Sequence, residues 1–120
     1  MGIENRKFRR VVVGPELTAS FVHGGQLFHR IGLGNVSLGG CMALIPGERS
    51  ADFESGQELE ALTLNHELLP SDSFTGRVTY ALGAGDSDMT WVGIGVQFLE
   101  MGPALRNSLQ ALVDGIPDPD

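Results

Sequence analysis

Hydrophobic and polar residues alternate along most of this chain with a period of two, the pattern of a β-strand with one buried face. In residues 74–82, Val78, Tyr80 and Leu82 fall on one face, whereas Arg77 and Thr79 fall on the other. Turn-forming glycines and prolines separate such segments, and Gly24-Gly25 is a two-residue hairpin signal. The pattern predicts six short antiparallel strands, at residues 17–23, 26–36, 41–45, 58–64, 74–82 and 91–98.

The period changes to that of an amphipathic helix near the end of the sequence. Four apolar residues then share one helical stripe: Leu105, Leu109, Leu112 and Val113. Pro103 suits the first turn of such a helix, and Gly115 suits its end. We therefore expect a helix over residues 103–114.

A chain of 120 residues is long enough for one domain with a single hydrophobic core. Six short strands in so short a chain close most easily into a barrel, because closure removes the open sheet edges. We expect an all-β fold, a six-stranded antiparallel β-barrel with one C-terminal α-helix. The barrel would occupy residues 13–99, and residues 1–12 would form a mobile basic head with no core to pack on.

Composition indicates the class of protein and the cellular compartment of this domain. The chain is 42% hydrophobic and 19% charged, which is typical of a globular protein. No apolar run approaches the roughly 20 residues of a transmembrane helix, and no signal peptide is visible, so we expect no membrane insertion. The single cysteine, Cys41, cannot form an internal disulfide and fits a cytoplasmic protein.

Charge is distributed unevenly in this chain of net charge −7. Residues 1–10 hold four basic side chains and one acidic one, whereas the other 110 residues hold four basic and 14 acidic ones. The acidic body would repel a nucleic-acid backbone, so we expect no nucleic-acid partner. The basic head favours a small anionic ligand instead.

Two motifs carry candidate chemistry. The first is Arg6-Lys7-Phe8-Arg9-Arg10, in which guanidinium groups could bind phosphate oxygens or the O6/N7 edge of guanine. The second is the run 35–40, N-V-S-L-G-G, at the end of a predicted strand. Asn35 and Ser37 are two residues apart, so alternation predicts that they share a face, and Gly40 allows a close approach of backbone to ligand.

Together these motifs resemble the signature of the PilZ domain family, R-x-x-x-R followed by (D/N)-x-S-x-x-G. The second begins 25 residues after Arg10, a spacing similar to that of the family, and G-V-Q-F at residues 95–98 followed by a helix resembles its usual ending. Each motif alone is weak evidence for the family. By chance, R-x-x-x-R occurs in roughly one chain in four of this length, and (D/N)-x-S-x-x-G in roughly one in twenty. The resemblance covers essentially the whole chain, which we interpret as a single domain over residues 1–120. The first motif lies so near residue 1 that we expect no preceding domain.

The resemblance implies a six-stranded barrel that binds the bacterial second messenger cyclic di-GMP (c-di-GMP). Carried over to this sequence, the ligand-binding residues would be Arg6, Arg9, Arg10, Asn35, Ser37 and Gly40. Arg6 and Arg10 would close over the ligand with Arg9 assisting, and the changed surface would signal to a still unidentified downstream protein. The resemblance implies no cofactor, and it leaves open whether the protein is a monomer or a homodimer.

Two other classes of function compete with this interpretation. The first is a protein-interaction adaptor of the same fold that works without nucleotide, although such members typically lack the arginines. The second is a small hydrolase, but no nucleophile elbow, P-loop or pair of catalytic carboxylates is visible, so we expect no enzyme. His23, His29 and His66 form no metal motif, and Asp86-Ser87-Asp88 lacks the rest of a calcium loop. Trp91 could stack on a ligand or pack in the barrel.

Overall fold

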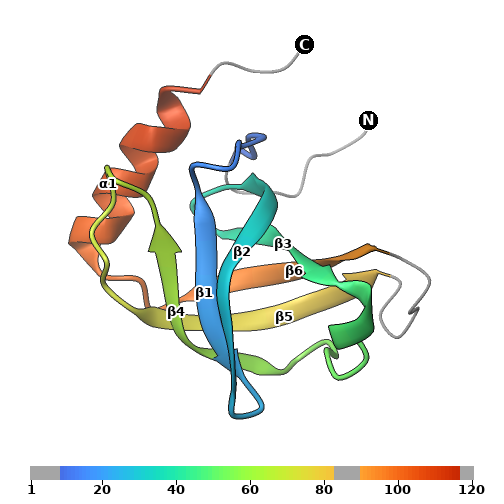
Figure 1. Ribbon diagram of the computed structural model, residues 1–120. Coiled ribbons are helices and arrows are strands. Elements are labelled where there is room, and N and C mark those ends of the chain that lie inside the picture. The colour runs from blue at the N-terminus through green and yellow to red at the C-terminus, as the bar shows by residue number, and fades with distance from the viewer. Residues whose placement is uncertain (1–8, 83–89, 117–120) are drawn as a thin grey trace, which may run out of the picture.

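The computed structural model describes residues 9–82 and 90–116, and within them six antiparallel strands form a closed barrel (Figure 1). The order of strands around the barrel is β1-β2-β3-β6-β5-β4. The predicted fold and its C-terminal helix are confirmed. The strands are β1 (Thr18–His23), β2 (Gln26–Val36), β3 (Gly40–Pro46), β4 (Glu58–Asn65), β5 (Phe74–Leu82) and β6 (Trp91–Leu99).

The β1–β2 hairpin turns at Gly24 and Gly25, as predicted. Both glycines have positive φ, 58° and 79°, which a two-residue hairpin turn of the favoured hand requires. Arg30 in β2 and Ala61 in β4 also have positive φ, near shifts in strand register. Such bulges increase the bend of a strand, so they help to close a small barrel. The alternation of hydrophobic and polar residues does not predict these bulges.

In β6, residues two apart share the inward face. Val92, Ile94 and Val96 are buried in the core, and they lie opposite inward residues of β3. In β5 the prediction fails after Val78. A register shift between Val78 and Tyr80 places Ala81 against the core, while Tyr80 pairs with Gly95. The ring of Tyr80 lies where a side chain at residue 95 would be, 2.2 Å from an ideal Cβ.

Helix α1 (Pro103–Asp114) stands beside β4 and the connection that follows it (Figure 1). Leu105, Leu109 and Val113 are fully buried and Leu112 is partly buried, so the predicted stripe packs against the barrel. A short 3-10 helix, η1 (Gly47–Arg49), follows β3 and was not predicted. None of the helices in the described residues is long and apolar enough to cross a membrane.

The first described residues are attached to the barrel. Val11 is 1% exposed, and its N–H and C=O groups both pair with Val36 at 2.9 Å. Burial of a valine side chain contributes about 1.5 kcal/mol to stability. The expectation that residues 1–12 have no core to pack on is therefore wrong at Val11, because a single apolar residue after the arginines inserts into the core. This contact fixes where Arg9 and Arg10 lie.

Candidate functional site

Arg10 and Asn35 meet at the end of the barrel where the described chain begins. The Val11–Val36 bridge aligns the head antiparallel to the end of β2. Arg10 then donates a hydrogen bond from Nη1 to Oδ1 of Asn35 at 3.0 Å. Two motifs that are 25 residues apart in the sequence therefore form one cluster in space.

The guanidinium of Arg10 keeps unused hydrogen-bonding capacity. Its Nε atom is buried and has no hydrogen-bond partner in the described part of the chain. A buried donor without a partner costs about 1–3 kcal/mol, and most buried donors in native proteins are paired. An anion or a base edge that reached this nitrogen would remove that cost.

Ser37 lies in the turn between β2 and β3 and shapes it. Its hydroxyl donates to the carbonyl of Gly40 at 3.4 Å and accepts from the N–H of Gly39 at 3.1 Å. The side chain is 4% exposed. Because β2 ends at Val36, the alternation that predicted a shared face for Asn35 and Ser37 does not reach Ser37. The hydroxyl retains only one acceptor lone pair for any other group.

Gly40 allows a close approach, but the group that approaches is the protein backbone. A Cβ atom at residue 40 would lie 2.1 Å from the carbonyl oxygen of Val96 and 3.3 Å from the Cα of Gln97. The N–H of Phe98 also donates to the carbonyl of Gly39 at 2.9 Å. The motif glycine therefore lets the turn and the start of β3 lie tightly against β6. Because β3 pairs with the end of β2, this packing helps to hold Asn35 in place.

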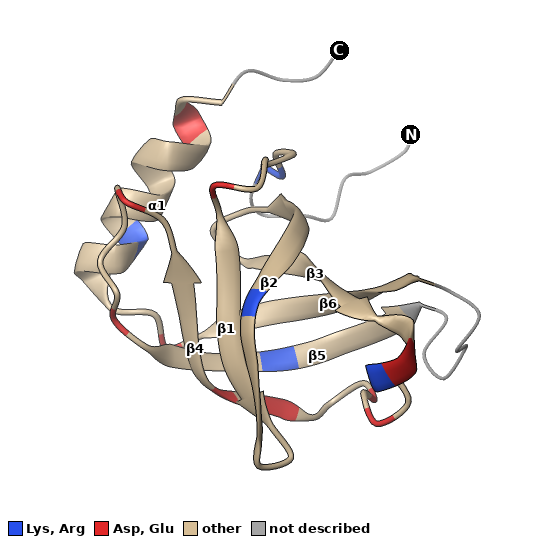
Figure 2. Ribbon diagram, in the orientation of Figure 1, with Lys and Arg blue, Asp and Glu red and all other residues tan. Residues whose placement is uncertain are grey.

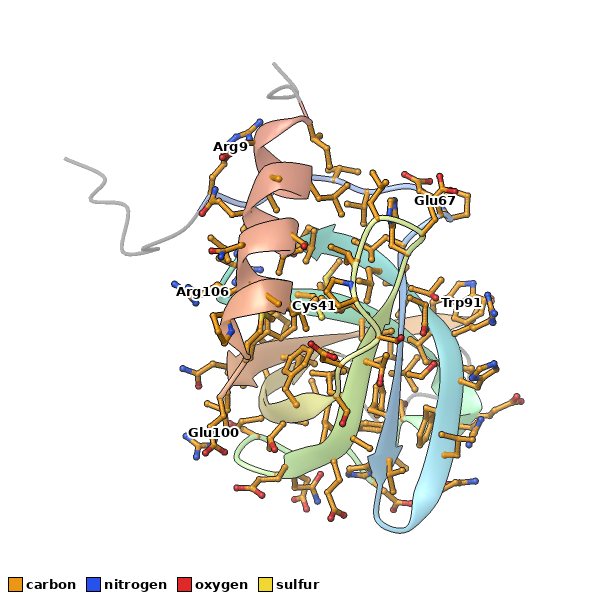
Figure 3. All side chains as sticks on the ribbon, turned by 90° about the vertical axis from the view of Figure 1, so that its left-hand side faces the viewer. Arg9, Cys41, Glu67, Trp91, Glu100 and Arg106 are labelled. Carbon is orange, nitrogen blue, oxygen red and sulfur yellow. The ribbon has the colours of Figure 1, made fainter. Side chains whose placement is uncertain are left out.

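Arg9 is directed to α1 and not to the motif turn. It donates from Nη1 to the carbonyl of Val113 at 2.9 Å and from Nη2 to the carbonyl of Ile116. Figure 3 shows Arg9 beside the C-terminal end of the helix. A cation at this end of a helix adds hydrogen bonds to its last carbonyls and complements the helix dipole. Arg6, the remaining candidate arginine, lies outside the described residues.

Met42 is a neighbour of the site that sequence analysis did not identify. It pairs with Asn35 across β2 and β3, and its side chain lies over the bare backbone of Gly34, 2.3 Å from an ideal Cβ there. It also approaches Gly93 on β6. The run Cys41 to Ile45 is apolar throughout, so the sequence does not indicate which of its residues face outward.

The other candidates lie away from this cluster. Trp91 is 55% exposed, which rules out the barrel-packing alternative, but it pairs with Pro46 at the far end of β3. Six residues separate it from Gln97, the partner of Gly40, or about 20 Å of strand. Among residues 9–82 and 90–116, no group of three His, Cys, Asp or Glu side chains could hold a metal ion.

Cys41 lies beneath the site, in the middle of the molecule (Figure 3). Burial raises the pKa of its thiol from 9.0 to about 12, and the charge of Arg10 lowers it in part. The thiol therefore stays protonated and unreactive in the native protein.

This raised pKa predicts a loss of stability in alkali. The native thiol binds its proton more tightly than the unfolded one, so its contribution is complete below pH 9 and is lost as the pH rises from 9 towards 12. Between pH 8 and pH 10 the free energy of unfolding should fall by about 1.4 kcal/mol through this group. Denaturant unfolding of wild type and Cys41→Ala measures it, since the variant lacks this part of the pH dependence. Parallel pH profiles would contradict the assignment.

Comparisons with known proteins identify the family of this fold. A family model described as the PilZ domain matches residues 4–115. Among solved structures, the chain is similar to the PilZ domain of YcgR from Escherichia coli with c-di-GMP, with a TM-score of 0.70 and 18% identity over 94% of this chain and 92% of that one. A sequence comparison with curated proteins finds no match.

Two longer proteins share the same barrel. The MrkH–c-di-GMP complex of K. pneumonia matches with a TM-score of 0.71 and 13% identity, over 92% of this chain and 52% of that chain. The inhibitor of motility MotI/DgrA of Bacillus subtilis matches with a TM-score of 0.67 and 17% identity, over 92% and 49%. This chain therefore spans about half the length of those two proteins. With a family model that matches most of its residues, the chain belongs to the PilZ domain family.

Proposed function

We propose that this protein is a receptor for c-di-GMP that signals to a protein partner. The observation that carries the proposal is the contact of Arg10 with Asn35, which joins the two motifs at one end of the barrel. The YcgR and MrkH structures described with c-di-GMP share this barrel, which supports the choice of ligand.

The roles of the site residues follow from their contacts. Arg10 presents a guanidinium with an unpartnered Nε beside Asn35, an arrangement suited to a phosphate or to the O6/N7 edge of guanine. Arg6 would complete the clamp. Ser37 and Gly40 would act indirectly, because they hold the turn that supports Asn35.

The link from Arg9 to α1 suggests how binding is transmitted. Arg9 adjoins Arg10 in the chain, and its guanidinium holds the carbonyls of Val113 and Ile116. A rearrangement of the head around the ligand would therefore change the contact with the helix. The altered surface of head and helix is the signal that a downstream protein would read in the cytoplasm.

Isothermal titration of c-di-GMP into the wild-type protein tests the proposal. We expect micromolar or tighter binding, with one ligand per protein or two if the nucleotides stack as a pair. Cyclic di-AMP is the matched control, and it should bind at least about tenfold more weakly, because adenine lacks the O6/N7 acceptor pair. Absence of heat with c-di-GMP would overturn the proposal and favour the adaptor that works without nucleotide.

A further inference from the structure

A row of paired residues crosses the outside of the barrel from Asn35 to β5. Met42 on β3 pairs with Asn35 on β2 and with Gly95 on β6. Gly95 in turn pairs with Tyr80 on β5, and Figure 1 shows β3, β6 and β5 side by side in this order. Paired residues of antiparallel strands point to the same face, and Val96 beside Gly95 is buried in the core, so the row lies on the outer face. With strands about 4.8 Å apart, about 14 Å separates the backbones of Asn35 and Tyr80.

The ring of Tyr80 covers the bare backbone of Gly95. Three of its carbon atoms lie 2.2–2.6 Å from an ideal Cβ at residue 95, so the ring reaches from β5 over β6, towards Asn35. Gly95 is buried although it belongs to the outer row, whereas Tyr80 itself is partly exposed. Among the described residues, no other ring or cation stacks on Tyr80, and no group bonds to its hydroxyl. The ring therefore rests on the sheet without a stacking partner in the described chain.

Met42 lies low in the middle of this row. Its Cε atom is 2.3 Å from an ideal Cβ at Gly34 on β2, and its Sδ atom is 3.1 Å from one at Gly93 on β6. The side chain therefore occupies space that two glycines leave free. Between Asn35 and Tyr80 the surface is thus a thioether on glycine backbone, which is apolar and adapts to the shape of a group that packs on it.

The four strands that carry the row contain no acidic residue, although the chain has a net charge of −7. Arg30 on β2 and Arg77 on β5 are the blue positions on these strands in Figure 2. Many of the acidic positions gather instead around η1, the loop after it and the start of β4. An anionic ligand that lies along the row is therefore not repelled by the strands beneath it.

We propose that the ring of Tyr80 stacks on one guanine of c-di-GMP while Arg10 and Asn35 hold another part of the same ligand. This inference rests on the proposed function, and it adds a base-binding residue that belongs to neither sequence motif. The ligand carries two guanines, and the ring over β6 lies two strand spacings, or about 10 Å, from Asn35 on β2. The second base of a nucleotide bound at Arg10 would extend along the row to this ring.

The chemistry of the ring selects a base at this end of the row. The face of an aromatic ring is the negative part of its quadrupole, so it disfavours a phosphate, whereas every base has a flat face that stacks on it. The phosphates would lie towards the guanidinium of Arg10, whose buried Nε lacks a partner within the described chain. The two ends of the row therefore suit different parts of one dinucleotide.

NMR of the ring tests this proposal directly, because Tyr80 is the only tyrosine of the chain and its ring signals are unambiguous. During titration with c-di-GMP, we expect these signals to move upfield in the ring current of the stacked base and to show nuclear Overhauser contacts to the C8 proton of guanine. Calorimetry on the same sample establishes whether the nucleotide binds. If it binds and the Tyr80 signals neither move nor show contacts, this inference is wrong and the proposed receptor stands. If it does not bind, both are wrong.

Variants of Tyr80 separate the ring face from a structural role. Tyr80→Leu keeps an apolar side chain over Gly95 without an aromatic face, so c-di-GMP should bind about tenfold more weakly, whereas Tyr80→Phe should bind within about twofold of wild type. Trp91→Leu removes a more exposed aromatic ring at the far end of β6 and is the matched control, with unchanged affinity expected. Thermal melts check that the variants are folded. Wild-type affinity of Tyr80→Leu, or an equal loss in Tyr80→Phe, would overturn the proposal.

Discussion

Replacement of Arg10 by alanine should weaken c-di-GMP binding at least about 100-fold while the barrel stays folded. A charge-assisted hydrogen bond contributes about 1.5–3 kcal/mol, and a fork of two such bonds is lost. The fold should tolerate the change, because the only hydrogen bond that the Arg10 side chain makes to the described residues goes to Asn35, and its buried Nε has no partner among them. Titration calorimetry measures the affinity, and a thermal melt measures the fold.

Two further variants make this result specific. Arg10→Lys keeps the charge but loses the planar fork, so its affinity should lie between those of wild type and Arg10→Ala. Arg30→Ala removes the same charge from an exposed position near the middle of β2, and its affinity should match that of the wild type. If Arg10→Ala bound c-di-GMP as the wild type does, the contact between the two motifs would have no part in recognition.

The strands were predictable because each has one buried face, and burial imposes a period of two on the sequence. That period carries no information about bulges, which is why Tyr80 was expected on the same face as Val78. One extra residue in β5 turns Tyr80 outward, where the absence of a side chain at Gly95 gives its ring room. The order of strands around the barrel was also beyond the sequence, since pairing of β1 with β4 and of β3 with β6 depends on closure.

The resemblance to the family suggested that the two motifs lie together, but it did not indicate that their residues make different contacts. Arg10 and Asn35 do meet. Arg9 does not join them, because carbonyls at the end of α1 accept its hydrogen bonds, and Val113 is 104 residues away in the sequence. No local pattern could indicate that partner. Likewise, the sequence does not distinguish Val11 from the rest of the charged head, and only the structure shows that its side chain is buried in the core.

Ser37 and Gly40 both make contacts within the protein that shape the end of β2. The hydroxyl of Ser37 bonds within its own turn, and the bare Cα of Gly40 faces the backbone of β6. Both residues hold the last residues of β2 in place, and Asn35 is one of them. If Asn35 binds the ligand, as proposed, Ser37 and Gly40 would position it, because a binding side chain depends on the residues that hold its backbone.

Gly40→Ala should therefore destabilise the fold, which a loss of ligand contacts alone would not do. The added methyl group would lie 2.1 Å from the carbonyl oxygen of Val96, and two hydrogen-bonded strands cannot move apart without breaking their ladder. We expect a cost of about 2–4 kcal/mol and a melting temperature lower by roughly 10–20 °C. Circular dichroism melts of the variant and wild type measure this shift.

Gly32→Ala is the matched control for this prediction, because it adds the same methyl group to the neighbouring strand β2. Nothing lies within 4 Å of an ideal Cβ at residue 32, so the melting temperature should change little. Titration with c-di-GMP well below both midpoints then separates the two roles of residue 40. A Gly40→Ala protein that melted with the wild type yet lost its affinity would mean that the ligand approaches this glycine directly. A Gly40→Ala protein with a lowered melting temperature would mean that residue 40 has to be glycine because it packs against the backbone of β6.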